Sequence, residues 1–245
     1  MERYEPETYG ERIAEIYDDL HSWHLDTGTA VDALARLAGR GPVLELGIGT
    51  GRLAIPLAKR GLEVHGIDAS EAMVARLRGK PGGDRITVEV ADFADVPAPG
   101  GPYSLIFVAF NTIFALGSQE EQVRCFRGVA RHLREDGVFV VEAFVPDVTR
   151  FDGGQRVEAT KVETDRVELE TSTHDRVGQR VLSQHVIVED GQIKTYPVQI
   201  RYAWPSELDL MARLAGLRLR RRLGGWRDEP FIATSPRHIS IYEHA

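Results

Sequence analysis

The chain has 245 residues, and 30 Lys and Arg residues against 37 Asp and Glu residues give it a formal net charge of −7. This acid excess argues against broad nucleic-acid binding, because affinity for phosphates comes mainly from clustered Lys and Arg. The hydrophobic fraction of 42% excludes wholesale disorder, and no segment approaches the roughly 18 apolar residues of a membrane helix. A polar N-terminus and a single cysteine, Cys125, lead us to expect a cytoplasmic protein without an intrachain disulfide.

Residues 1–40 are predicted to be helical. Residues 8–20 place Ile13 and Ile16 on one face at helical spacing, with Thr8 as the expected N-cap. A second helix is expected over residues 29–38, before glycines end the pattern.

From residue 42 onward, short apolar segments alternate with amphipathic ones. This order predicts strands followed by helices, and therefore a parallel sheet with helices on both faces. The expected strands are residues 42–46, 62–67, 86–90, 103–110 and 138–144, and the expected helices are residues 52–60, 70–78 (capped by Ser70) and 119–133.

Residues 155–204 alternate with a period of two, which predicts an antiparallel meander of three or four strands inserted after the fifth parallel strand. A helix over residues 206–215, capped by Ser206, and two closing strands complete the order. The sequence therefore predicts a doubly wound α/β fold with a mostly parallel seven-stranded sheet. We expect residues 1–147 and 205–245 to form this α/β domain and residues 148–204 to form the inserted subdomain.

The most informative segment runs from a buried strand through Gly47, Gly49 and Gly51 into a helix. Alternate glycines permit positive φ and let a ligand approach the backbone closely. Three glycines in five residues exceed what a tight strand-to-helix turn requires, so the pattern favours ligand binding over a purely structural turn.

The same segment lacks the signatures of phosphate binding. The dinucleotide pattern G-x-G-x-x-G fails because Arg52 stands where the third glycine belongs, and the Gly-Lys-Ser/Thr of a P-loop is absent. Glu45, two residues before the first glycine, would repel a pyrophosphate. It would attract a ligand that carries an ammonium or a sulfonium group.

Glu45-x-Gly47-x-Gly49-x-Gly51 resembles the first motif of the class I S-adenosylmethionine-dependent methyltransferases, whose fold is Rossmann-like. The resemblance covers residues 8–145 and extends to residues 205–245. It implies that S-adenosyl-L-methionine is the cofactor and that the N-terminal helices form a lid over it. The implied cofactor-binding residues are Glu45, Gly47, Gly49, Gly51, Arg52, Asp68, Ala69, Asp92, Phe93 and Phe110.

The later positions in this set have family roles and local alternatives. Asp68 ends the second strand, where the family places an acid on the ribose hydroxyls; as an N-cap it would duplicate Ser70. Asp92 follows the third strand, where an acid meets the adenine amine and Phe93 covers the ring, although Asp92 could also cap a turn. Arg52 would cap the loop, reach a ligand carboxylate or be solvated.

The catalytic candidates are Tyr17 and Asn111. By the resemblance Tyr17 closes over the methionine end of the cofactor, but it could equally belong to the apolar face of its helix. Asn111 faces donor and acceptor, or is a turn residue in the left-handed region. His21 and His24 lack a second cluster of ligands, so no metal is expected.

Within that family the N-terminal helical cover and the β insertion resemble those of the amino-sugar and natural-product N-methyltransferases. The resemblance implies methyl transfer to a small-molecule acceptor by in-line displacement, in which proximity and orientation supply most of the acceleration. The acceptor atom, N, O or C, stays open. An RNA or protein methyltransferase of the same fold would need a coherent basic face, and a noncatalytic cofactor-binding module is the other alternative. Relatives with such insertions often form homodimers; no membrane partner is expected.

Overall fold

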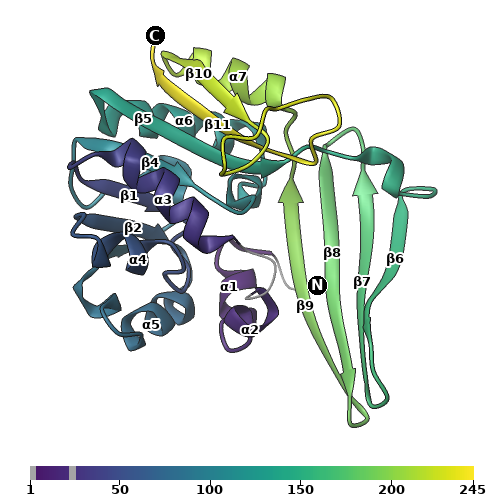
Figure 1. Ribbon diagram of the computed structural model, residues 1–245. Helices are drawn as coiled ribbons and strands as arrows, with labels where there is room; N and C mark the ends of the chain where they lie inside the picture. The colour runs from purple at the N-terminus through teal and green to yellow at the C-terminus, as the bar shows by residue number, and fades with distance from the viewer. Residues whose placement is uncertain (1–3, 22–25) are drawn as a thin grey trace.

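Two separate sheets organise the residues described by the computed structural model, which are 4–21 and 26–245 (Figure 1). The larger sheet has seven strands in the order β10-β11-β5-β4-β1-β2-β3. Its strands are β1 (Val43–Leu46), β2 (Val64–Asp68), β3 (Thr87–Val90), β4 (Tyr103–Val108), β5 (Leu133–Phe144), β10 (Leu217–Leu223) and β11 (Arg237–His244).

Strands β1 to β5 run parallel, and β11 pairs antiparallel with both β5 and β10. Every residue of β1 is buried, and in β4 only Ser104 is not. Such continuously buried strands are typical of a parallel sheet that is covered on both faces. The predicted doubly wound, mostly parallel seven-stranded sheet is confirmed.

Helices cover both faces of the larger sheet. Helices α3 (Thr27–Ala38) and α4 (Ala54–Lys59) pack on one face, and α6 (Gln119–His132) and α7 (Pro205–Leu214) pack on the other. Cys125 of α6 is fully buried. Helix α5 (Glu71–Gly79) follows β2 and begins at the predicted cap, because Ser70 Oγ accepts a hydrogen bond from the Met73 N–H. No described helix is both long enough and apolar enough to cross a membrane.

Two of the three predicted helix caps, Thr8 and Ser206, are wrong. The N-terminal helix is divided into α1 (Thr8–Ile13) and α2 (Tyr17–His21), and Thr8 is not the N-cap. Its hydroxyl instead accepts a hydrogen bond from the Glu5 N–H, one turn earlier. Helix α7 begins with Pro205, which is favoured at the first helical position and leaves Trp204, not Ser206, as the cap.

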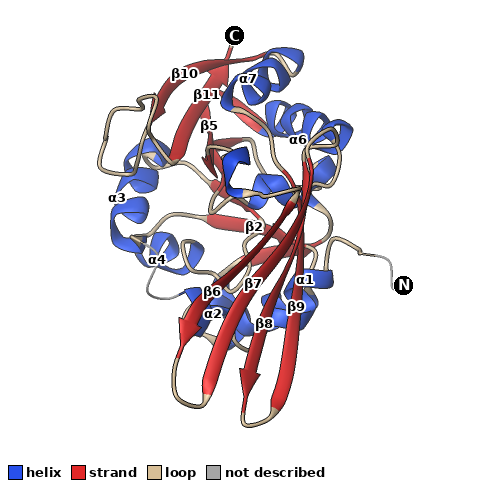
Figure 2. Cartoon of the chain, turned by 90° about the vertical axis from the view of Figure 1, so that its right-hand side faces the viewer, coloured by secondary structure: helices blue, strands red, loops and turns tan. Residues whose placement is uncertain are grey.

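The inserted segment forms a second sheet, which confirms the predicted meander (Figure 2). Its four antiparallel strands pair in chain order. Asp190 and Gly191 both adopt positive φ in the last hairpin, as a tight hairpin turn requires. The strands are β6 (Gln155–Val162), β7 (Arg166–Asp175), β8 (Arg180–Glu189) and β9 (Gln192–Arg201).

A buried arginine joins this second sheet to the α/β layers. Arg201, at the end of β9, donates to Gln122 of α6 at 2.6 Å and to Glu207 of α7 at 2.6 Å. It also donates to Gln179 in the β7–β8 turn at 3.0 Å. The Arg201 guanidinium therefore holds one end of the four-stranded sheet against α6 and α7. The hairpins at the other end of this sheet extend away from the α/β layers (Figure 1).

Candidate active site

The glycine turn between β1 and α4 has the geometry that its sequence predicts. Gly47, Gly49 and Gly51 have φ values of 68°, 54° and 81°, which favour glycine. A Cβ on Gly47 would overlap the Thr112 side chain, whereas nothing lies within 4 Å of the position at Gly49. The turn is therefore tightly packed at its first glycine and open at its second.

Asp68 ties the glycine turn to the end of β2. Its carboxylate accepts from the Gly49 N–H at 2.7 Å and from the Ser70 N–H at 2.9 Å. Burial raises the pKa of Asp68, and these two hydrogen bonds oppose that rise. Asp68 thus holds the turn, while Ser70 caps α5. Both residues also line the cavity described below.

Glu45 is a buried carboxylate beside this turn. Burial raises its pKa to about 8; the charge of Arg52 opposes the rise and that of Asp68 adds to it. Its Oε2 atom is buried and has no hydrogen-bond partner among the described residues. The Ala54 N–H donates to the carboxylate, so only this one oxygen is unpartnered. An ionised carboxylate with an unpartnered oxygen is costly in such a place, so this position favours a cationic partner.

A cavity of about 1490 Å³ joins the ends of the parallel strands, α1, α2 and one face of the four-stranded sheet. Ligands of open α/β sheets bind at this carboxyl edge. Nine of the predicted site residues line the cavity: Tyr17, Gly47, Gly49, Asp68, Ala69, Asp92, Phe93, Phe110 and Asn111. Glu45, Gly51 and Arg52 lie behind that lining.

The end of β4 forms a strained floor of this cavity. Phe110 and Asn111 have φ values of 52° and 66°, so Asn111 does adopt the left-handed turn geometry. Its Oδ1 atom accepts from the Phe144 N–H at 2.7 Å, which leaves the amide nitrogen as the donor. The Phe110 N–H donates to Glu142 Oε2 at 2.9 Å, and Trp226 Nε1 donates to Oε1 of the same residue at 2.8 Å.

Carboxylates of the N-terminal helices bind the glycine turn and the start of α5. Asp18 accepts from Thr50 Oγ1 at 2.6 Å and pairs with Lys80 at 2.6 Å. Although burial raises the pKa of Asp18, the hydrogen bonds from Lys80 and Thr50 bring it below its ordinary value. Glu11 accepts from Ser70 Oγ at 2.8 Å. The two helices therefore stand directly against the predicted cofactor site.

Tyr17 lies both on the apolar face of its helix and at the cavity, the two positions that the sequence left open. It packs in the small apolar cluster of α1 and α2 with Ile13, and it also lines the cavity. Burial raises its pKa to about 12, so the phenol keeps its proton at neutral pH. Tyr9, which the sequence did not indicate, lines the same cavity and packs edge-to-face on Tyr17 with ring centroids 6.4 Å apart.

The structure also shows the contacts of Asp92 and Arg52. Asp92 accepts from the Ala94 N–H at 2.9 Å and so caps a turn while lining the cavity. The Arg52 guanidinium lies 5.8 Å from the Phe110 ring centroid and donates to Thr27 at 3.3 Å. His24 and the side chain of His21 lie outside the described residues.

Comparisons with known proteins agree with this geometry. The model of a family described as a methyltransferase domain matches residues 43–137. The cypemycin N-terminal methyltransferase of a Streptomyces species is 31% identical over 244 residues, 98% of each chain. The structure of the CcbJ methyltransferase from Streptomyces caelestis matches with a TM-score of 0.91 and 39% identity, over 99% of this chain and 100% of that chain.

A more distant neighbour shares the fold alone. CalS10, an amino pentose methyltransferase from Micromonospora echinaspora solved with S-adenosylmethionine bound, matches with a TM-score of 0.69 and 20% identity, over 94% of this chain and 97% of that chain. The near-complete alignments include the inserted sheet as well as the glycine turn. The chain belongs to the class I S-adenosylmethionine-dependent methyltransferases.

Proposed function

We propose that this methyltransferase acts on an amine nitrogen of a small-molecule natural product. The observation that carries the proposal is the charge of the cavity. Six carboxylates line it against two guanidinium groups, an excess of four negative charges. The acids are Glu5, Asp68, Asp92, Glu121, Asp147 and Glu170, and the bases are Arg150 and Arg156.

An acidic cavity of this kind suits two cationic partners. The cofactor carries a sulfonium and an ammonium group, and an amine acceptor arrives largely protonated at neutral pH, so both are attracted to the carboxylates. The name of the cypemycin relative specifies N-terminal methylation, which is also transfer to an amine. The negative cavity gives no corresponding attraction to RNA.

The cofactor fits the residues around the glycine turn. Glu45, whose Oε2 atom is orphaned, would ionise beside a cation, and the open side of Gly49 leaves room beside the turn. In this proposal Gly47, Gly49 and Gly51 shape the turn and Arg52 supports it. Asp68 and Ala69 contact the ribose, Asp92 and Phe93 the adenine, and Phe110 borders the methionine end.

S-adenosylmethionine supplies a methyl group that is already activated by its positively charged sulfur. The chain then has to align the acceptor with that group and exclude water. A protonated amine must first lose its proton, for which the cavity carboxylates are the available acceptors, before its nitrogen attacks the methyl carbon and the methyl–sulfur bond breaks to leave S-adenosylhomocysteine. We assign the alignment to Tyr17, whose protonated phenol donates a hydrogen bond, and to the Asn111 amide at the strained floor. The α/β part, residues 1–147 and 205–245, holds the cofactor, and residues 148–204 present the acceptor wall.

The test uses S-adenosylmethionine with a labelled methyl group and a panel of small amines, alcohols and bulk RNA. We expect label in the amines, on nitrogen by mass spectrometry and NMR. Label in RNA, or label in alcohols alone, would contradict the amine assignment. Binding of the cofactor without transfer to any member of a broad panel would favour a noncatalytic module.

A further inference from the structure

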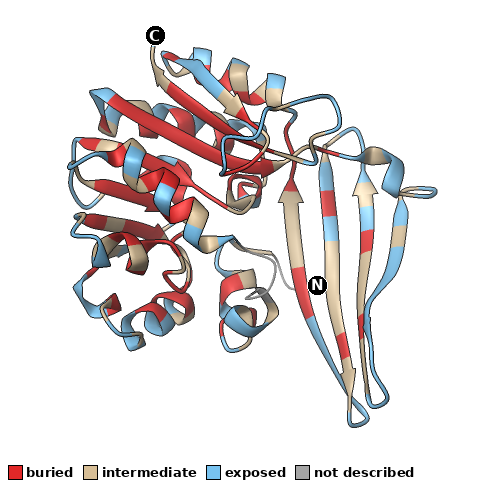
Figure 3. Cartoon of the chain, in the orientation of Figure 1, coloured by how far each residue is buried: buried red, intermediate tan, exposed pale blue. Residues whose placement is uncertain are grey.

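The buried part of the central strand β5 carries one charged side chain. The strand is buried from Gly137 to Ala143 (Figure 3), and Glu142 within it is only 7% exposed. A carboxylate in such a place is costly unless hydrogen-bond donors surround it. The donors that Glu142 accepts from therefore indicate its role.

The Glu142 carboxylate joins segments that lie far apart in the chain. Its Oε2 atom accepts from the Phe110 N–H at 2.9 Å, just after β4. Its Oε1 atom accepts from Trp226 Nε1 at 2.8 Å, between β10 and β11, and lies 3.7 Å from the Arg237 guanidinium. A carboxylate can accept on both oxygens, whereas the amide of a glutamine accepts on one alone. Holding both donors therefore requires an acid at this position.

Glu142 also holds the residue next to Phe110. Strand β4 ends at Val108, so the N–H groups of Phe110 and Asn111 lie beyond its ladder. The Asn111 N–H donates to the Glu142 carbonyl at 3.1 Å, and Asn111 Oδ1 accepts from the Phe144 N–H at 2.7 Å. The side chain and the main chain of one residue thus bind both N–H groups of this pair.

The pair needs this support because its backbone is strained. The φ values of 52° at Phe110 and 66° at Asn111 lie in the left-handed region, which costs free energy for residues other than glycine. Such conformations persist only where the surroundings hold them. A group that aligns reactants can cost about a hundredfold in rate when it moves by about 1 Å. Relaxation of this pair would therefore disturb the floor of the cavity.

A purely structural role would be to tether Trp226. This side chain is buried, and residues 233–236 of the same connection line the cavity. A tether, however, needs a single acceptor, which glutamine would also supply. The second oxygen of Glu142 goes to the strained Phe110 amide, which a tether alone does not explain.

We propose that Glu142 is a positioning residue for methyl transfer. It holds Phe110 and Asn111 in the strained conformation in which they border the donor methyl and align the acceptor, and Trp226 keeps the carboxylate directed at Phe110. The proposal rests on the proposed roles of these two floor residues. It adds to them a residue that does not itself line the cavity.

The experiment compares Glu142→Gln with the wild-type protein. Label transfer from S-adenosylmethionine is measured with cyclohexylamine and with trialanine amide, each of which carries one amine. We expect kcat to fall at least tenfold and the KM of the cofactor to change less than threefold, because the glycine turn is not held by Glu142. Hydrogen exchange at the Phe110 and Asn111 amides, followed by NMR without any acceptor, should become at least tenfold faster.

A double-mutant cycle tests the role of the strain. Glycine adopts positive φ freely, so adding Glu142→Gln to Phe110→Gly should lower kcat less than threefold further. Asp209→Asn is the matched control, because Asp209 also accepts from two other elements, Arg222 at 2.6 Å and Tyr242 at 3.0 Å, and does not line the cavity. It should lower the midpoint of urea unfolding, as Glu142→Gln does, and leave kcat unchanged.

The outcomes separate the positioning role from the amine function. Unchanged kcat in Glu142→Gln, an equal loss in the Phe110→Gly background, or a similar loss in Asp209→Asn would overturn the positioning role. Unchanged exchange at the two amides would overturn it even if no amine were methylated. Transfer to neither amine, together with faster exchange, would instead count against the amine function and leave the positioning role standing.

Discussion

The buried Glu45 carboxylate should make the stability of the cofactor-free protein depend on pH. Its folded-state pKa is about 8, against an ordinary value of 4.5. Between these values the folded chain keeps a proton that the unfolded chain has released, so stability falls as pH rises through this window. Above about pH 8 both states are ionised at this residue, and the loss is complete.

Glu45→Gln removes this titration without changing the size of the side chain. One pH unit corresponds to about 1.4 kcal/mol, and ionisation of the folded state near pH 8 reduces the effect of the last unit, so the wild-type protein should lose about 2 kcal/mol relative to Glu45→Gln between pH 6 and pH 8. The comparison cancels every other titrating group. Urea unfolding of both proteins at pH 6, 7 and 8 measures the difference. Parallel stability curves for the two proteins would refute the reasoning.

Cofactor affinity should also depend on the ionisation of Glu45, but it should rise with pH where the stability of the cofactor-free protein falls. A cation beside Glu45 favours its ionised form, so binding releases a proton and the affinity for S-adenosylmethionine rises toward pH 8. Calorimetry in two buffers of different ionisation enthalpy counts the released proton, and Glu45→Gln should release none. S-adenosylhomocysteine, which lacks the positive sulfur, separates the effect of the sulfonium from that of the ammonium.

Three further changes test other contacts. Gly47→Ala should weaken cofactor binding at least tenfold, because the added methyl group overlaps Thr112 and φ is positive at this residue. At Gly49 φ is also positive but the space is open, so Gly49→Ala should lower the free energy of unfolding by only about 1–2 kcal/mol. Arg201→Met should cost about 3–5 kcal/mol in urea unfolding, and adding Glu207→Met should restore most of it. Tyr17→Phe should lower the rate equally from pH 6 to 9, since the pKa of this phenol is about 12; a changed pH profile would contradict its neutral role.

Most of the α/β architecture could be predicted from local patterns, because strands buried on both faces are continuously apolar. The division between α1 and α2 could not, since apolar spacing continues across it. Asp18 of α2 reaches Thr50 and Lys80, and contacts so far along the chain leave no mark in the local spacing. Alternation likewise revealed the strands of the insertion but not the register in which they pair.

The residues of the glycine turn and the strand ends were found because each lies at the carboxyl edge of the sheet. Glu142 and Trp226, which hold the strained Phe110 amide, were missed, since they are 32 and 84 residues from their partners. A signal was present, however: Glu142 is the one charged residue in the apolar segment Val138–Phe144. Charge within a central strand indicates a buried partner.

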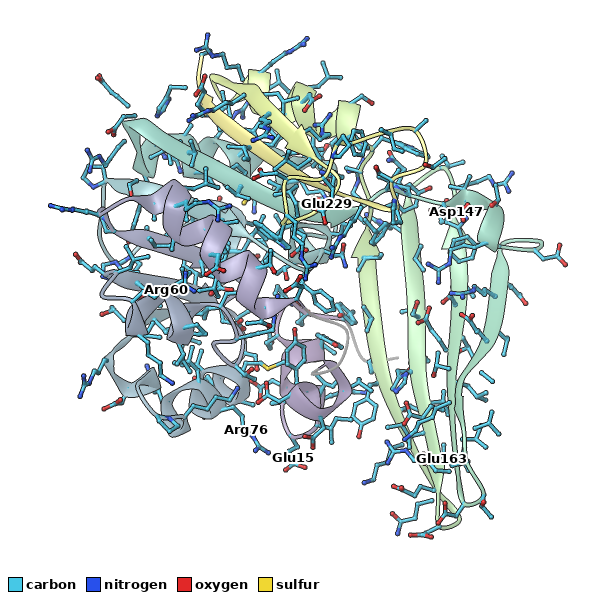
Figure 4. All side chains as sticks on the ribbon, viewed as in Figure 1. Glu15, Arg60, Arg76, Asp147, Glu163 and Glu229 are labelled. Carbon is cyan, nitrogen blue, oxygen red and sulfur yellow. The ribbon has the colours of Figure 1, made fainter. Side chains whose placement is uncertain are left out.

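Cys125 has a practical consequence for biophysical work. It is the single cysteine of the chain, it is fully buried in α6, and burial raises the pKa of its thiol. Maleimide reagents need an accessible thiolate, so the native protein should remain unmodified. A cysteine introduced at Glu163, in the distal hairpin (Figure 4), would then be the sole attachment point for a dye or a spin label, without first removing Cys125.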